Sequence, residues 1–79
     1  MNVNINTMEQ KEINLINLYN AKGEKHGLWI DYHSNGQLWY KGHYVNGKKE
    51  GYWEWYYFNG QLWWKGHFVR GEEIRGIYF

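Results

Sequence analysis

Apolar and aromatic residues fall into short segments, separated by polar stretches that contain glycine, through most of the chain after residue 27. The segments read LWIDYH, LWYKGHYV, YWEWYYF and LWWKGHFV. They are rich in β-branched and aromatic residues, which favour strands. Glycine recurs too often for a helix, and no 3.6-residue period persists. The pattern therefore predicts strands joined as β-hairpins.

These hairpins are copies of one 24-residue unit. Residues 27–50 and 51–74 are identical at 13 positions, in the frame G-x-W-x-x-Y-x-x-N-G-Q-L-W-x-K-G-H-x-V-x-G. Residues 23–29 form a partial copy before the pair. After it, GEEIRGIYF at 71–79 restarts the pattern with one extra residue. A fixed repeat period is typical of arrays in which each unit packs on its neighbours.

The repeats define the predicted domain organisation. We expect one repeat domain over residues 13–79, preceded by a flexible or weakly ordered segment at 1–12. A further strand is predicted over 13–20, although 7–19 can also be read as a short helix. The predicted fold is all-β: a single curved antiparallel meander sheet of about five to seven strands.

The dipeptides Asn35-Gly36 and Asn59-Gly60 predict where each hairpin turns. Asn-Gly is the preferred pair for a two-residue type I′ turn, because both positions need a positive φ. If each pair occupies the two loop positions, the register of both hairpins follows.

This register sets predicted cross-strand pairs. A tryptophan faces a glycine in each hairpin, so the aromatic ring can cover the exposed backbone of the glycine. Two aromatic pairs also follow, and Glu54 falls opposite Lys65. The predicted pairs are Trp29–Gly42, Trp53–Gly66, Tyr32–Trp39, Tyr56–Trp63 and Glu54–Lys65.

The same register divides the side chains between two faces. One face is apolar and is the predicted core; it carries Trp29, Leu38, Tyr40, Tyr44, Trp53, Trp55, Tyr57, Leu62, Trp64 and Phe68. The other face alternates aromatic and polar groups, as expected of a recognition surface. The predicted partner-binding residues on it are Tyr32, Trp39, Lys41, His43, Tyr56, Trp63, Lys65 and His67.

These motifs resemble a known family. YKGHYVNGKKEGYW at 40–53 is similar to the MORN repeat, whose core reads roughly Y-x-G-x-[YW]-x-N-G-x-x-x-G. GYWEWYYFNGQLWWKGHFVRG at 51–71 more closely resembles the bacterial YwqK-type antitoxin variant. The resemblance covers residues 23–76 and implies an elongated sheet of successive hairpins. It also implies scaffolding, dimerisation, binding of proteins or acidic phospholipids and, for the antitoxin variant, a toxin partner.

Composition narrows the possible functions. Aromatic residues make up 22% of the 79 residues, which partly compensates for the small size of the core. A net charge of +1 gives no strong signal for nucleic-acid binding. The absence of cysteine fits a reducing compartment, and we expect a cytoplasmic protein, since no signal peptide or membrane span is recognised.

The candidate chemical groups do not point to an enzyme. His43 and His67 recur at equivalent positions, but two strands apart they would lie about 9.5 Å from each other, too far to share one zinc ion. Glu72 and Glu73 are adjacent and read as a solvated pair. No metal or cofactor is expected.

We therefore expect a non-enzymatic module that binds a protein through its aromatic face or an edge of the sheet. The partner can be a toxin, another target that binding inhibits (as in a phage or mobile-element inhibitor), or a second copy in a homodimer. The alternative is a module for acidic lipid headgroups, or for choline or carbohydrate, held by the aromatic residues.

Overall fold

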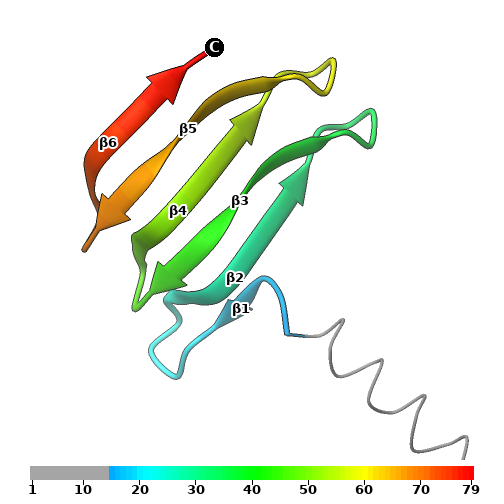
Figure 1. Cartoon of the computed structure of the whole chain (residues 1–79). Helices are drawn as coiled ribbons and strands as arrows, with labels where there is room; N and C mark the ends of the chain where they lie inside the picture. Colours follow the sequence, from blue (N-terminus) through cyan, green and yellow to red (C-terminus); the bar gives the residue numbers. More distant parts are fainter. Residues whose placement is uncertain (1–14) are drawn as a thin grey trace, which may run out of the picture.

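The computed structural model describes residues 15–79 and places six strands in one open, curved antiparallel sheet (Figure 1). Each strand lies beside the next one in the chain, from β1 at one edge to β6 at the other. The strands are β1 (Leu18–Tyr19), β2 (Lys25–Tyr32), β3 (Leu38–Val45), β4 (Lys48–Tyr56), β5 (Leu62–Val69) and β6 (Glu72–Tyr78). The predicted meander is confirmed.

The predictions for the N-terminal part are tested only over its described residues. Between residues 15 and 20, the predicted strand is limited to the two residues of β1. The expected flexible segment at 1–12 lies outside the described residues, as does most of the alternative helix.

Type I′ turns occur between the repeats. Asn46 and Gly47 have φ values of 49° and 84°, and Arg70 and Gly71 have 50° and 86°. Each pair forms a two-residue loop, since Val45 pairs with Lys48 and Val69 with Glu72. The prediction that these turns lie at Asn35-Gly36 and Asn59-Gly60 is wrong.

The loop at Asn35-Gly36 has three residues instead of two. The His33 N–H donates to the Gln37 carbonyl at 2.8 Å, and the Gly36 N–H donates to the His33 carbonyl at 2.9 Å. Gly36 has a φ of 89°, whereas Asn35 is not left-handed. This is the common three-residue hairpin loop, in which a type I turn is followed by a glycine in the left-handed conformation. The Asn35 side chain favours it by accepting the Gln37 N–H at 3.0 Å.

A bulge beside each three-residue loop restores the predicted register. Tyr32 pairs with Leu38 and Asp31 with Tyr40, which leaves Trp39 without a partner on β2. Trp63 is skipped in the same way. The three-residue loop shifts the pairing by one residue, and the bulge, which skips one residue, shifts it back.

Because the two offsets cancel, the middle of each hairpin pairs as predicted. The confirmed pairs are Trp29–Gly42, Trp53–Gly66 and Glu54–Lys65. The aromatic pairs Tyr32–Trp39 and Tyr56–Trp63 are wrong, because the bulged tryptophans have moved out of the ladder.

The core is a single layer of rings on one side of the sheet. Buried side chains within residues 15–79 are Trp29, Trp53 and Trp64. Further rings pack against them at centroid distances of 5.0–6.4 Å. We call this side the aromatic face; it comprises Trp29, Tyr40, Tyr44, Trp53, Trp55, Trp64 and Phe68. It agrees with most of the predicted apolar face.

Trp53 covers the glycine of the preceding repeat. Its ring lies where a side chain at Gly42 would be, although its Cα partner on the other side is Gly66. Three residues of β4, from Gly51 to Trp53, oppose Gly42 alone, so the indole swings across β3. The Trp53 N–H then donates to the His43 carbonyl at 3.1 Å. The Trp53 side chain thereby joins the second repeat to the first.

The predicted covering of glycine is therefore wrong in its detail. The ring over Gly42 belongs to Trp53 and not to Trp29. At Gly66, the space for a side chain is filled by Trp64 and the Arg75 carbonyl. Trp29 instead donates its N–H to the Leu18 carbonyl of β1, also at 3.1 Å. Cross-strand position alone does not fix the direction of a large ring.

Candidate functional site

The side of the sheet opposite the aromatic face mixes apolar, charged and phenolic groups. We call it the mixed face; it comprises Leu28, Ile30, Lys41, His43, Tyr52, Glu54, Tyr56, Lys65, His67, Arg75 and Ile77. Two hollows open on it. The larger, of about 500 Å³, lies over β2, β3 and β4 between Ile30, His43 and Tyr52.

Glu54 organises the centre of the mixed face. Its carboxylate accepts hydrogen bonds from the Tyr52 hydroxyl at 2.9 Å and the Tyr56 hydroxyl at 3.0 Å. The Lys41 ammonium lies 3.9 Å away. Desolvation, together with the hydrogen bond to Glu54, raises the pKa of Tyr52 to about 12, and the same causes raise the pKa of Tyr56. Both phenols are therefore held as neutral hydrogen-bond donors.

Five of the eight predicted partner-binding residues lie together on this face. They are Lys41, His43, Tyr56, Lys65 and His67. Tyr32 is exposed at the end of β2. Sequence reasoning missed Tyr52 and Glu54 as members of the set. The spacing of two between Tyr52, Glu54 and Tyr56 was the available signal, because alternate residues of a strand share a face.

Trp39 and Trp63 do not join the mixed face, because each occupies a bulge. The Trp39 ring packs against Tyr40 at 5.2 Å and His33 at 5.6 Å. The Trp63 ring packs against Tyr57 at 6.2 Å and Tyr78 at 6.0 Å. Trp63 also borders a hollow of about 300 Å³ on the aromatic face, together with Trp64, Phe68 and Tyr78.

The histidines lie in separate environments. His43 on β3 and His67 on β5 have β4 between them, and the His67 ring lies 5.4 Å from the Tyr52 ring. Over residues 15–79, no three His, Asp or Glu side chains come together as metal ligands. His33 links the two hairpin loops, since its Nε2 lies 2.9 Å from the Tyr56 carbonyl and its ring 5.4 Å from Phe58.

Two lysines lie over the aromatic face. The Lys49 ammonium is 5.6–5.9 Å from the centroids of four rings. These rings are Tyr44, Trp53, Trp55 and Phe68. The Lys25 ammonium lies 4.7 Å from Trp29. The rings thus already hold cations, which is a stabilising arrangement for a ring face exposed to water.

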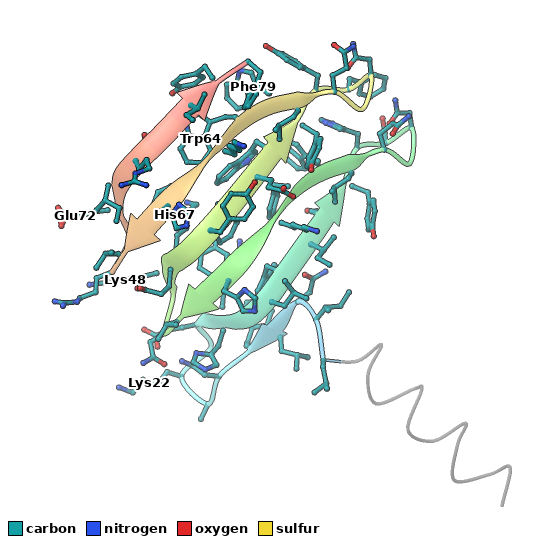
Figure 2. The ribbon with its side chains drawn as sticks, viewed as in Figure 1. Lys22, Lys48, Trp64, His67, Glu72 and Phe79 are labelled. Atoms are coloured by element: carbon teal, nitrogen blue, oxygen red, sulfur yellow. The ribbon has the colours of Figure 1, made fainter. Side chains whose placement is uncertain are left out.

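Within the described residues 15–79, strand β6 forms an open edge of the sheet. All seven of its residues are exposed, including Ile74 at 64%, Ile77 at 52% and Tyr78 at 68%. The Phe79 N–H donates to the Trp63 carbonyl of β5 at 2.9 Å. Antiparallel bonding alternates along a strand, so the N–H and C=O groups of Gly76 and Tyr78 point away from the sheet. Figure 2 shows Glu72 and Phe79 at the two ends of this edge.

The extra residue of the last partial repeat lies in β6. Between the pairs His67–Arg75 and Phe68–Glu73, residue Ile74 has no partner on β5. Nearby, the buried Trp64 N–H has no acceptor in the described part of the chain. The third repeat therefore starts out of phase with the first two, and within residues 15–79 its strand β6 has β5 on one side and no strand on the other.

Comparison with known proteins places this sheet in a family. A family model for a MORN repeat variant matches residues 25–46 and 49–69, more than half of the chain.

The chain belongs to the MORN repeat variant family. The two matched segments fall on the two hairpins, β2–β3 and β4–β5. MORN repeats are generally associated with binding of proteins or membrane lipids. No curated protein and no solved structure matches the chain. Within residues 15–79, no helix is long and apolar enough to cross a membrane.

Proposed function

We propose that this MORN protein is a non-catalytic protein-binding module. The outer edge of its strand β6 pairs with an extended segment of a partner. The observation that carries the proposal is the full exposure of β6, with outward backbone groups and apolar side chains. Unpaired strand edges are templates for a further strand, and natural sheets usually protect them. The partner can be a toxin or another cytoplasmic protein whose activity the binding inhibits.

The experiment compares capture of partners from the cells that produce the protein. Ile74→Lys/Ile77→Lys places two charges on the β6 edge. The matched control, Val45→Lys/Val69→Lys, makes the same change at two exposed β-branched residues of interior strands. We expect the edge variant to capture at least tenfold less partner than the wild type, and the control to capture as much as the wild type. Equal capture by both double variants would overturn the proposal.

A homodimer remains a separate prediction. Light scattering of the same three proteins at micromolar concentration tests it. A dimer that dissociates only in the edge variant supports pairing through β6. A wild-type protein that stays monomeric at all concentrations excludes the second copy.

The small-ligand alternatives have less support. A choline-type ligand on the aromatic face would compete with Lys49, whose ammonium already lies over four rings. An acidic lipid headgroup would have to approach Glu54 on the mixed face. Retention on choline resin or on anionic vesicles would favour one of these alternatives.

A further inference from the structure

The free edge is bordered by a hollow on each face of the sheet. On the mixed face, a hollow of about 170 Å³ lies between Tyr52, Lys65, His67, Arg75 and Ile77. On the aromatic face, the 300 Å³ hollow reaches β6 at Glu73 and Tyr78. A strand added beside β6 would place successive side chains on alternate faces, next to the β6 side chains that form the outer wall of each hollow.

The hollow on the mixed face is cationic. Lys65 and Arg75 line it together with His67, and no carboxylate does. Arg75 and His67 are direct partners across β5 and β6. Within residues 15–79, the ion pair that forms is Lys41–Glu54, so neither Lys65 nor Arg75 has a carboxylate within 4.0 Å. Lys65 still lies opposite Glu54 across β4 and β5, whereas Arg75 at the edge lies opposite His67 and has no carboxylate as its cross-strand partner.

The hollow on the aromatic face favours a different side chain. Trp63, Trp64 and Phe68 supply apolar walls. Glu73 and Lys49 line this hollow as well, so it holds one charge of each sign, and the Lys49 ammonium lies over the Trp55 and Phe68 rings. An uncharged apolar side chain therefore fits here, because it gains ring contact without placing a charge near either group.

We infer that β6 selects an extended strand in which acidic side chains on the mixed face alternate with apolar side chains on the aromatic face. This inference rests on the proposed function of the β6 edge and specifies the chemistry of its partner. The β6 sequence itself carries Arg75 where an acidic residue is required, so a second copy is a poor occupant of this edge. Charge complementarity of this kind sets specificity and association rate.

The test uses two labelled, end-capped six-residue peptides, one alternating glutamate with valine and the other lysine with valine. Binding to the full chain is measured by fluorescence anisotropy at low salt. We expect the glutamate peptide to bind at least tenfold more tightly than the lysine peptide. Added salt should reduce the difference, since exposed charges are screened.

A charge reversal provides the decisive comparison. His67→Glu/Arg75→Glu should reverse the preference in favour of the lysine peptide. Lys22→Glu is the matched control, because this exposed lysine lies in the loop beside β1 at the opposite edge (Figure 2). It should leave the tenfold preference unchanged. A preference that Lys22→Glu abolishes as effectively as the double variant would reflect net charge alone and would overturn the inference.

The outcomes separate this inference from the proposed function. If both peptides bind equally and Ile74→Lys/Ile77→Lys abolishes both, the edge binds strands but the charge selection is wrong. If neither peptide binds while cellular capture still depends on the edge, the inferred partner chemistry is likewise overturned. If neither peptide binding nor capture depends on the edge, both proposals fail.

Discussion

Two buried tryptophans on the aromatic face, Trp53 and Trp64, differ in the hydrogen bonding of their indole N–H groups. Trp53 is fully buried and donates its N–H to a neighbouring strand. Trp64 is almost as buried, at 4% exposure, yet its N–H finds no acceptor within the described residues. Both contribute a large apolar area, but only Trp53 adds a polar bond between repeats.

This difference predicts unequal costs for the same substitution. Trp53→Phe and Trp64→Phe both remove part of an indole from the core. Trp53→Phe also breaks the bond to the His43 carbonyl, so it should destabilise the fold more, by about 1 kcal/mol. Urea unfolding followed by circular dichroism measures both free energies. Equal losses would mean that the indole bond contributes nothing.

The carboxylate of Glu54 predicts the behaviour of two tyrosines at high pH. In the folded state the pKa of Tyr52 is about 12, above its ordinary 10.0. A raised pKa of this kind stabilises the fold below pH 10, and that stabilisation is lost as the pH rises towards 12. Tyr52 is 42% exposed. Of the causes that raise its pKa, the hydrogen bond to Glu54 is the one that a mutation can remove by itself.

Glu54→Gln should therefore lower the pKa of Tyr52 and of Tyr56, because the negative acceptor of both hydroxyls becomes neutral. Ultraviolet absorbance of the phenolate during an alkaline titration measures the change. Glu50→Gln is the control, since Glu50 accepts the backbone N–H of Arg70 and bonds neither hydroxyl. Identical titrations for both variants would exclude Glu54 as the cause.

At the scale of elements, the same Asn-Gly dipeptide forms two kinds of turn. Asn46 adopts the left-handed conformation of a two-residue turn, whereas Asn35 does not. The repeat places Arg70 at the position equivalent to Asn46, and its φ of 50° is unfavourable for arginine. Asparagine tolerates this conformation better, because its short polar side chain bonds locally.

Arg70→Asn should therefore stabilise the protein by about 0.5–1 kcal/mol, since it relieves an unfavourable backbone conformation. The reciprocal change, Asn46→Arg, should destabilise it by at least as much, because Asn46 also accepts a bond from Asn20 at 3.0 Å. Thermal denaturation measures both. No change from Arg70→Asn would show that the strain is relieved elsewhere.

The sequence predicts the elements better than it predicts the direction of their side chains. Asn-Gly and strand-forming segments locate the hairpins, and the central pairs follow because the loop and the bulge offset each other. No residue type in the sequence marks the bulge, so the sequence predicts Trp39 and Trp63 on the mixed face, and the structure does not place them there. Which glycine Trp53 covers depends on the irregularity in β4, where three residues oppose Gly42, and the spacing of the residues does not reveal it.

At the scale of the whole molecule, strands make their extensive contacts with their neighbours in the chain. The stability of such an array is approximately the sum of its repeats and the interfaces between them. Trp53 and the turns supply those interfaces, since the Gly47 and Gly71 N–H groups also bond the carbonyls of Lys25 and Lys49. Adding a repeat should therefore add stability.

We predict this gain for a chain in which residues 47–70 are duplicated directly after Arg70. The junction keeps an Arg-Gly turn, so the new hairpin enters in phase. The melting temperature should rise, by about 4–8 °C for each kcal/mol that the added interface supplies. The control carries Trp53→Ala in the inserted copy alone and should lose most of the rise. A lower melting temperature for the intact duplication would contradict an additive array.

The bulges at Trp39 and Trp63 have a consequence for how the family can vary in length. Ser34 lies in the loop and Trp39 in the bulge, so neither residue has a partner across β2 and β3. Deleting either one should therefore keep Tyr32 opposite Leu38 and Asp31 opposite Tyr40, whereas deleting a paired residue such as Tyr40 would turn the following side chains to the opposite face. Homologues should therefore differ in length at the loop and at the bulge independently of each other, and not within the paired stretch that follows the bulge.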